Sequence, residues 1–216
     1  MDRPPPSTPG RRSGGPTHAR PEPLPAPEPE VQRAAVRYPG GLSARLRWGG
    51  SGQAAEVFGI SEGGGSLIDH GPLVGPEPDR LCRAELRIEG PAGTWTARFA
   101  SRISDEPQAV LWDTTGLLLL TYGFHLYGLD ARSGDVRWTF ASRVPLVAAF
   151  VSSRLPHAIA QGELETTALD ARGGVVWRLP LSDVVAEASM VGGRLVLTGL
   201  GGSLLTLDPL TGRTAS

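Results

Sequence analysis

The amino-acid sequence predicts an all-β fold made of four copies of one unit, and three observations support this prediction. An acidic residue followed by a glycine turn recurs at steps of 41, 40 and 38 residues, at Glu89, Asp130, Asp170 and Asp208. Short runs of valine, leucine, threonine and aromatic residues are interrupted by glycine about every 8 to 12 residues. No segment keeps the period of a helix. A fixed repeat of this length is typical of repeat architectures such as propellers.

The second unit shows the strand pattern most clearly. The turn pairs Thr115-Gly116 and Gly123-Phe124, together with the turn from Ala131 to Gly134, separate four apolar runs, which predicts four antiparallel strands. The other units follow the same pattern, and a loop over residues 71–80 interrupts the first. Over the four units, strands are expected at residues 55–60, 66–69, 83–89, 94–100, 109–113, 117–122, 125–130, 135–140, 146–151, 157–161, 164–170, 175–179, 184–190, 194–199 and 203–208.

The last unit has only the start of a fourth strand, at residues 212–216, whereas the run over residues 43–48 has no partner. The ending Arg47-Trp48 matches Arg137-Trp138, which belongs to a fourth strand. We therefore expect the N-terminal strand to complete the C-terminal sheet, which closes a small four-bladed β-propeller and removes two open sheet edges. The alternative is an arc, in which four units are cut from a larger ring or close by oligomerising.

Residues 1–38 are predicted to form a disordered, proline-rich tail, and the propeller domain is expected over residues 42–216. Ten of the first 30 residues are proline and large apolar residues are nearly absent. Such a segment cannot bury enough surface to offset the loss of chain entropy. Its stiffest part, residues 21–29, has a proline spacing that suits an aromatic groove, and the alternative role is a plain spacer.

Composition favours some functional classes over others. The chain has 216 residues and a formal net charge of −1, and its scattered arginines do not predict the basic stripe of a nucleic-acid-binding protein. Cys82 is the single cysteine, so no internal disulfide forms, and we expect it to be a small buried group in a strand. Neither a membrane span nor a secretory signal is recognisable, which predicts a cytoplasmic chain.

The recurrent turn has a clear structural purpose. Its aspartate accepts hydrogen bonds from backbone N–H groups further along the turn, its glycine supplies a positive φ, and its tryptophan lies flat against the neighbouring sheet. We therefore assign the motif residues to the scaffold: Glu89, Gly93, Trp95, Asp130, Gly134, Trp138, Asp170, Gly174, Trp177, Asp208 and Gly212.

The copy Gly128-x-Asp130-x-x-Ser133-Gly134-x-x-x-Trp138 resembles the tryptophan-docking motif of pyrroloquinoline-quinone (PQQ)-type propeller repeats, Ala-x-Asp-x-x-Thr-Gly-x-x-x-Trp. The resemblance covers roughly residues 85 to 213, and the copy around Asp170 is one residue short before Trp177. It implies a propeller whose cofactor-free members act as assembly scaffolds or as sensor domains. Enzymes of this family hold the quinone with calcium, a catalytic aspartate and often a pair of adjacent cysteines.

This chain has one cysteine and no recognisable set of ligands for calcium, so we predict a non-catalytic scaffold or sensor without cofactor or metal. The four histidines, at positions 18, 70, 125 and 157, lack metal-ligand spacing, and we interpret His125 and His157 as turn or rim residues. The alternatives are a fragment of a quinoprotein dehydrogenase, or a truncated propeller without independent activity.

A protein or peptide is the expected partner, because propeller loops form a rigid binding platform. The loop that departs most from the repeat is the candidate contact surface. It consists of Gly71, Pro72, Leu73, Val74, Gly75, Pro76, Glu77, Pro78, Asp79 and Arg80. An inert insertion is the alternative interpretation of this loop.

Overall fold

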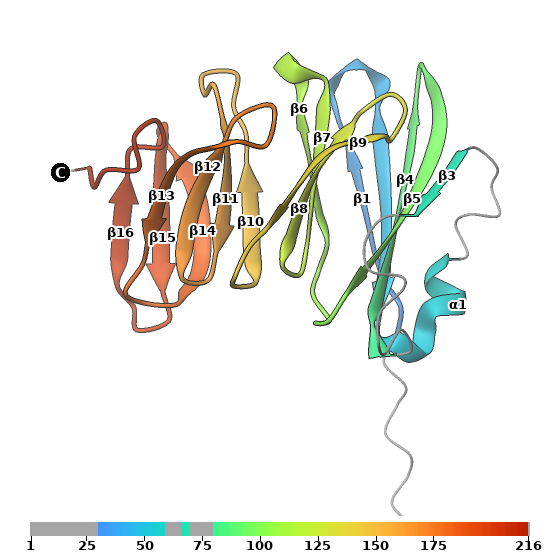
Figure 1. Cartoon of the computed structure of the whole chain (residues 1–216), viewed down its shortest axis with the longest axis horizontal. Helices are drawn as coiled ribbons and strands as arrows, with labels where there is room; N and C mark the ends of the chain where they lie inside the picture. Colours follow the sequence, from blue (N-terminus) through green and yellow to red (C-terminus); the bar gives the residue numbers. More distant parts are fainter. Residues whose placement is uncertain (1–29, 59–65, 70–79, 216) are drawn as a thin grey trace, which may run out of the picture.

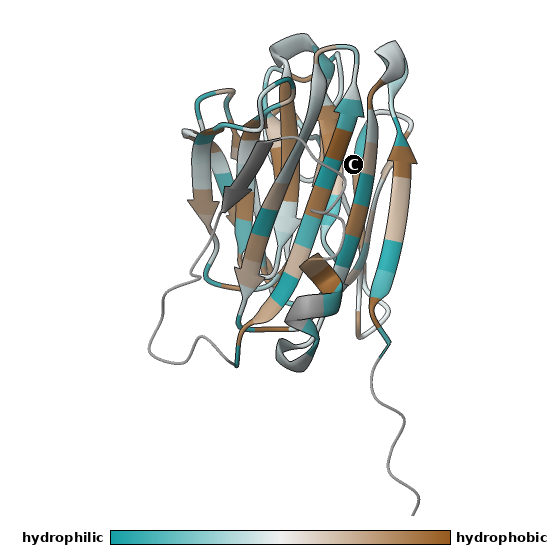
Figure 2. Cartoon of the chain, turned by 90° about the vertical axis from the view of Figure 1, so that its right-hand side faces the viewer, coloured by the Kyte–Doolittle hydropathy of each residue, from teal (hydrophilic) through white to brown (hydrophobic). Residues whose placement is uncertain are grey.

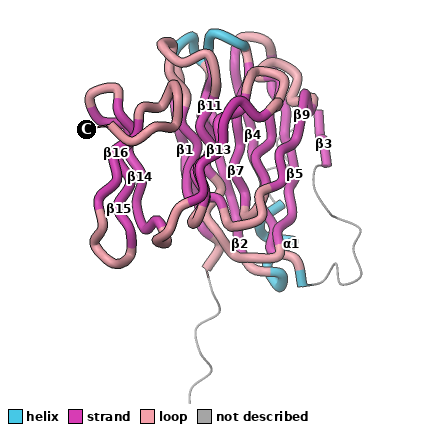
Figure 3. The backbone as a smooth tube through the Cα atoms, turned by 60° about the vertical axis from the view of Figure 1, so that its left-hand side comes forward, coloured by secondary structure: helices cyan, strands magenta, loops and turns pink. Residues whose placement is uncertain are grey.

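The computed structural model describes residues 30–58, 66–69 and 80–215. Within these ranges the strands form four sheets that follow one another in a row, each packed face to face on the next (Figure 1). The sheet nearest the N-terminus stands at one end of the row, and the sheet that precedes the C-terminus stands at the other (Figures 1 and 3). The molecule is therefore a linear stack of β-sheets in chain order.

The first sheet is the most irregular. Its strand order is β1 (Gln32–Arg37), β2 (Ser43–Gly49), β4 (Cys82–Gly90), β5 (Gly93–Ser101) and β3 (Ser66–Asp69). The pairs are antiparallel except for β3, which runs parallel to β5. A short turn, η1 (Pro39–Gly41), joins β1 to β2, and η2 (Ser51–Gln53) and α1 (Ala54–Val57) follow β2.

The remaining sheets are antiparallel meanders in which each strand pairs with the next along the chain. The second sheet contains β6 (Gln108–Trp112), β7 (Leu117–Tyr122), β8 (His125–Asp130) and β9 (Val136–Ala141), with the turn η5 (Asp113–Thr115) after β6. The third contains β10 (Leu146–Phe150), β11 (Ala158–Gly162), β12 (Glu165–Leu169) and β13 (Val175–Pro180). The fourth contains β14 (Val185–Val191), β15 (Arg194–Gly199) and β16 (Leu204–Leu207).

The apolar alternation of the strands explains why the sheets stack. Successive side chains of a strand point to opposite faces, and every residue of β7 is buried because both of its faces are covered. Leu118 and Leu120 pack in the core cluster shared with the first sheet, whereas Leu117 and Leu119 pack in the cluster shared with the third. A third cluster, which includes Ile159 of β11, joins the third sheet to the fourth.

The outer faces at the two ends of the row carry polar residues. On the outer side of the fourth sheet, Glu187, Thr198 and Thr206 share the face with the exposed apolar residues Val191 and Leu204. The strands of the first sheet likewise alternate hydrophilic and hydrophobic bands (Figure 2).

The all-β fold of four successive units, two of them four-stranded, is confirmed, but the expected closing strand is wrong. Residues 43–48 do form a strand, yet β2 pairs with β1 and β4 of the first sheet, at the far end of the row from β16. The alternating residues Ala44, Leu46 and Trp48 explain this placement, because they bury their side chains in the core shared with the second sheet. The arrangement corresponds to the arc alternative.

Two further expectations are corrected. The proposed strand at residues 55–60 is instead the helix α1 as far as Val57, and residues 59–60 lie outside the described part of the chain. The tail was expected to extend to residue 38, but residues 32–37 form β1, because Ala34 packs on the core while its neighbours on the strand face outward. The remaining strands lie within two residues of their expected bounds.

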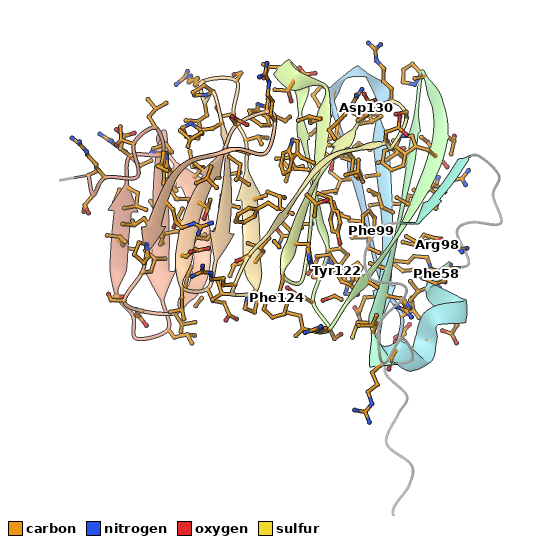
Figure 4. The ribbon with its side chains drawn as sticks, viewed as in Figure 1. Phe58, Arg98, Phe99, Tyr122, Phe124 and Asp130 are labelled. Carbon is orange, nitrogen blue, oxygen red and sulfur yellow. The ribbon has the colours of Figure 1, made fainter. Side chains whose placement is uncertain are left out.

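All three tyrosines of the chain belong to the interface between the first two sheets (Tyr122 is labelled in Figure 4). Tyr38 donates its phenol hydrogen to the carbonyl oxygen of Ala109 at 2.6 Å, which ties the first sheet to β6. Burial raises the pKa of Tyr38 and Tyr127 to about 12 and raises the pKa of Tyr122 as well.

Alkaline pH should therefore weaken this interface. The folded-state pKa values lie above the unfolded value of about 10, so the stability that these phenols contribute is complete below pH 10 and is lost as pH rises toward 12. In a spectrophotometric titration, we expect no tyrosinate absorbance near pH 10 in the folded protein and full ionisation there in guanidinium chloride. Normal titration of all three residues in the folded protein would contradict the packing.

Candidate functional site

The recurrent turns of all four units gather at one edge of the row, where Asp130 lies in Figure 4. Each turn follows a strand that runs toward this edge, namely β4, β8, β12 or β16. The turns after the last three begin with Asp130, Asp170 and Asp208. This turn-bearing edge is the most regular part of the repeat, and it forms the candidate functional site.

The turn carboxylates accept hydrogen bonds from groups of their own turns and neighbouring strands. Asp130 accepts hydrogen bonds from the backbone N–H groups of Arg132 and Ser133 at 2.9 and 3.1 Å, and from the Arg137 guanidinium at 2.7 Å. The bond from Arg137 is the main reason why the pKa of Asp130 is lowered. Backbone N–H groups, chiefly that of Gly174, lower the pKa of Asp170 in the same way. These carboxylates stay ionised and hold turn geometry.

Tryptophans connect each sheet to the turn of the next. The indole N–H of Trp95 donates to the carbonyl oxygen of Ala131 at 3.2 Å, and that of Trp138 donates to the carbonyl oxygen of Ala171 at 3.0 Å. The Trp138 ring also lies against Gly173, where a Cβ would come within 2.8 Å of the ring. Glycine is needed there for this contact and for its φ of 81°.

The third connection uses a histidine. Nε2 of His157 bonds the carbonyl oxygen of Pro209 at 2.7 Å, so this nitrogen carries the proton, and the imidazole meets Trp177 edge-on at 6.0 Å. Pro209 follows Asp208 as Ala171 follows Asp170, so His157 takes the carbonyl that an indole binds in the other units. His157 lies in the bend that precedes β11, as expected for a turn residue, and its side chain is buried.

The one-residue deletion before Trp177 is absorbed inside the turn. In the second and fourth turns, the N–H of Gly134 or Gly212 bonds the aspartate carbonyl four residues earlier, whereas in the third the N–H of Gly173 bonds Asp170 three residues earlier. The positive φ therefore falls on Gly173 and not on Gly174, where the sequence motif placed it. Gly93, in the turn of the first unit, also has a positive φ.

A groove opens at the turn-bearing edge between the first and second sheets. It has a volume of about 570 Å³. Leu42, Ile88 and Leu111 supply apolar lining, and Asp113 and Arg132 supply charged groups. The turn at Pro91-Ala92 borders it on the side of the first sheet, and the turns after β6 and β8 border it on the side of the second.

A second hollow, of about 360 Å³, continues along the same edge between the second and third sheets. It shares Thr115, Gly116 and Asp130 with the first groove and ends at Ala171 and Arg172. We call the two hollows together the turn-edge groove. Their shared residues make one elongated depression across three consecutive sheets.

The sequence did not indicate this groove. Its lining is mostly backbone and small residues at turns, and no residue type there signals chemistry. The predicted contact loop cannot be compared with it, because residues 71–79 lie outside the described ranges, while Arg80 is described and exposed. Within residues 30–58, 66–69 and 80–215, no group of three or more His, Cys, Asp or Glu side chains is placed to hold a metal ion.

Comparison with known proteins supports the repeat assignment. A PQQ-type family model, described as outer membrane protein assembly factor BamB, matches residues 123–215, from β8 to the last turn. The match begins just before the clearest copy of the motif and ends after the weakest. The chain is thus similar to PQQ-like β-propeller proteins over somewhat less than half of its length.

Solved structures give a similar picture at low sequence identity. The dihydro-heme d1 dehydrogenase NirN is 12% identical, with a TM-score of 0.50 over 71% of this chain and 36% of that one. BamB from Moraxella catarrhalis is 15% identical, with a TM-score of 0.46 over 86% of this chain and 66% of that one. HIRA is 13% identical, with a TM-score of 0.46 over 87% of this chain and 54% of that one.

The chain spans between about a third and two thirds of the length of these structures. At these identities the likeness concerns the fold alone. No curated protein matches the sequence significantly. Among the helices in the described part of the chain, none has the length and apolar character needed to cross a membrane.

The docking of Trp138 gives a direct test of the stacking. Trp138→Ala should lower the free energy of unfolding by about 3–5 kcal/mol, because it removes a buried large aromatic ring, and Trp138→Phe should cost less. Chemical denaturation measures both. Val136→Ala, at a position 40% exposed on the same strand, is the control and should change stability by about 0.5 kcal/mol or less. A loss below about 1 kcal/mol for Trp138→Ala would contradict the docking assignment.

Proposed function

We propose that this protein is a non-catalytic interaction module that binds a segment of a partner protein in the turn-edge groove. The observation that supports this most is the groove itself, which runs across consecutive sheets and is built from turns on a rigid scaffold. Binding sites are commonly carried by loops that a rigid framework positions.

The lining of the groove suits a peptide. Apolar side chains such as Ile88 and Leu111 offer surface for an apolar anchor residue, and Asp113 and Arg132 offer partners at the rim for polar groups. Both charged residues are exposed, so they can hydrogen-bond to a bound peptide and orient it without a large cost from desolvating their own charges. An apolar centre with a polar rim is the usual composition of a protein interface.

The arrangement of ionisable groups favours binding over catalysis. Asp130 and Asp170 are held by hydrogen bonds within their turns, so they are poor candidates for proton transfer. A PQQ site would also need calcium, which takes six to eight oxygen ligands. Among the described residues, no three acidic side chains are grouped to hold a metal ion, so the donors in this part of the chain do not fit the quinone and its metal.

The family match supports a role in assembly. The model that matches residues 123–215 is described as an assembly factor, and an assembly factor acts by binding other proteins. We extend only that general role to this chain. A cytoplasmic location and the absence of nucleic-acid partners stay predictions from the sequence.

Peptide display tests the proposed groove. We expect peptides selected from a random library on the folded protein to bind Ala92→Trp at least about tenfold more weakly, because the indole fills the groove from an exposed turn position. Leu200→Trp is the matched control, since Leu200 is a 71% exposed turn residue at the opposite edge. Fluorescence anisotropy measures both affinities. Peptides that bind both variants equally well would contradict the groove assignment.

The enzymatic alternative has its own test. Incubation of the protein with PQQ and calcium, followed by gel filtration, should leave no stoichiometric quinone absorbance with the protein. Retention of one quinone per chain would overturn the non-catalytic proposal. It would leave the stacking of the sheets untouched.

A further inference from the structure

Arginines collect on the outer side of the first sheet, at the end of the row opposite the C-terminus. Because directly paired residues on neighbouring strands share a face, the register places seven arginines with two glutamates there. Arg83 stands at the end of the group, beside Gly49. We call the other six residues the arginine face: Arg33, Arg37, Arg45, Arg47, Arg87 and Arg98. The opposite face of the same strands carries the core residues Ala44, Leu46 and Ile88.

The two glutamates are already engaged by three of the arginines. Glu85, which is fully buried, accepts from Arg98 at 3.1 Å. Glu89 lies 3.0 Å from Arg87 and 3.4 Å from Arg45. The Arg98 guanidinium also lies over the Phe58 ring at 4.5 Å, on the outer side of the sheet (Figure 4). The two glutamates therefore offset two of the three positive charges in this part of the arginine face.

The other three arginines, on β1 and β2, have no carboxylate to balance them within the described part of the chain. Arg33 and Arg47 pair directly across the two strands, and like charges in that position repel. Among the described residues, no carboxylate lies within ion-pair distance of Arg33, Arg37 or Arg47. Arg33 and Arg37 are exposed, and Arg47 is half-buried. The fold therefore keeps an excess of positive charge at its outermost strands.

This excess surrounds a shallow hollow of about 350 Å³. Arg33, Arg45 and Arg47 line it, together with the small residues Ala34 and Ala35. Ala35 stands directly opposite Arg45 and leaves space between the guanidinium groups. A carboxylate in this space can accept hydrogen bonds from more than one arginine, which is the favoured geometry for such pairs.

The adjoining edge indicates the form of the ligand. Within the described strands, β1 is the last strand of its sheet on this side, so one row of its backbone N–H and C=O groups faces outward. Charged residues often protect such edges from unwanted pairing. That purpose does not explain Arg45 and Arg47, because β2 is an interior strand with partners on both sides.

From this arrangement we propose that the arginine face binds an extended acidic segment of a partner protein, which adds as a strand beside β1. In such a strand every second side chain points to the arginine face, at a spacing of about 6.8 Å. Acidic residues at alternate positions therefore meet Arg33, Arg37 and the hollow. Main-chain hydrogen bonds supply affinity and the carboxylates supply selectivity.

A peptide suits this surface better than a nucleic acid does. The hollow has room for one or two carboxylates, and the strand edge offers a regular row of backbone N–H and C=O groups whose spacing matches that of an added peptide strand. Single-stranded nucleic acids are usually bound by aromatic stacking platforms beside basic grooves, and the residues that line the hollow contain no aromatic ring. The arginine face is also separate from the turn-edge groove, so the two binding proposals stand or fall independently.

The test uses the full chain and labelled peptides of about eight residues, the length of an ordinary strand. One peptide alternates glutamate and valine, and a second has the same composition in two blocks. By fluorescence anisotropy at low salt, we expect the alternating peptide to bind at least about fivefold more tightly than the block peptide. Equal binding of the two would overturn the strand-addition proposal, and so would tighter binding of a single-stranded oligouridylate than of the alternating peptide.

Matched variants locate the interaction. Arg33→Ala combined with Arg47→Ala should weaken binding of the alternating peptide by about tenfold or more. Arg154→Ala combined with Arg194→Ala removes the same charge from exposed positions on the third and fourth units, and should change binding less than about twofold. Equal losses in the two double variants would mean unspecific charge attraction and would overturn the proposal.

A variant with reversed charge distinguishes a lost binding site from a misfolded protein, because it should gain binding of an oppositely charged peptide. Arg33→Glu combined with Arg47→Glu should bind a peptide that alternates lysine and valine and should reject the glutamate peptide. Circular dichroism should show an unchanged β spectrum. A folded reversed variant that still prefers the glutamate peptide would contradict the assignment.

Discussion

The indole-to-carbonyl contact between consecutive sheets is the interaction on which the structure depends. In the first two interfaces a large aromatic ring lies against the turn of the next sheet, and the ring both fills the interface and donates a hydrogen bond at its edge, as Trp95 and Trp138 do. The contact fixes the distance and the register between sheets, because the receiving turn must place a carbonyl and leave room for the ring. His157 meets the same requirement in the third interface with a different donor, which indicates that the position of the donor matters more than its identity.

Stacking by this contact has consequences for function. It brings the turns of successive units to one edge, and the turn-edge groove forms where those turns do not fill the space between two sheets. It also leaves two end faces that no sheet covers. The outer face of the fourth sheet mixes polar residues with exposed valine and leucine side chains, whereas the first sheet ends in the arginine face beside a free strand edge. Both proposed binding surfaces therefore follow from one mode of packing.

Local patterns in the sequence predicted the strands well and the global arrangement less well. The repeat spacing and the glycine turns located β7, β8 and β15 to the residue. The partner of residues 43–48 was missed because strand pairing is a long-range choice, decided by which sheet offers apolar surface to Ala44, Leu46 and Trp48. The arginine face was also missed, although its signal was present. Arginines at every second position, as in Arg45-Leu46-Arg47, mark a charged strand face that net charge conceals. The turn-edge groove has no comparable signal, because backbone and small residues form most of it.

The most direct test of the open stack is the distance between its two ends. Spin labels at Ala35 on the outer side of the first sheet and at Leu204, which is 70% exposed on the fourth, can be introduced in a Cys82→Ser background. Three sheet-to-sheet interfaces of about 10 Å each separate the two sheets, so pulsed electron paramagnetic resonance should give a distance of about 30 Å or more. A distance near 10 Å would mean that the first and fourth sheets pack against each other, and would contradict the open row.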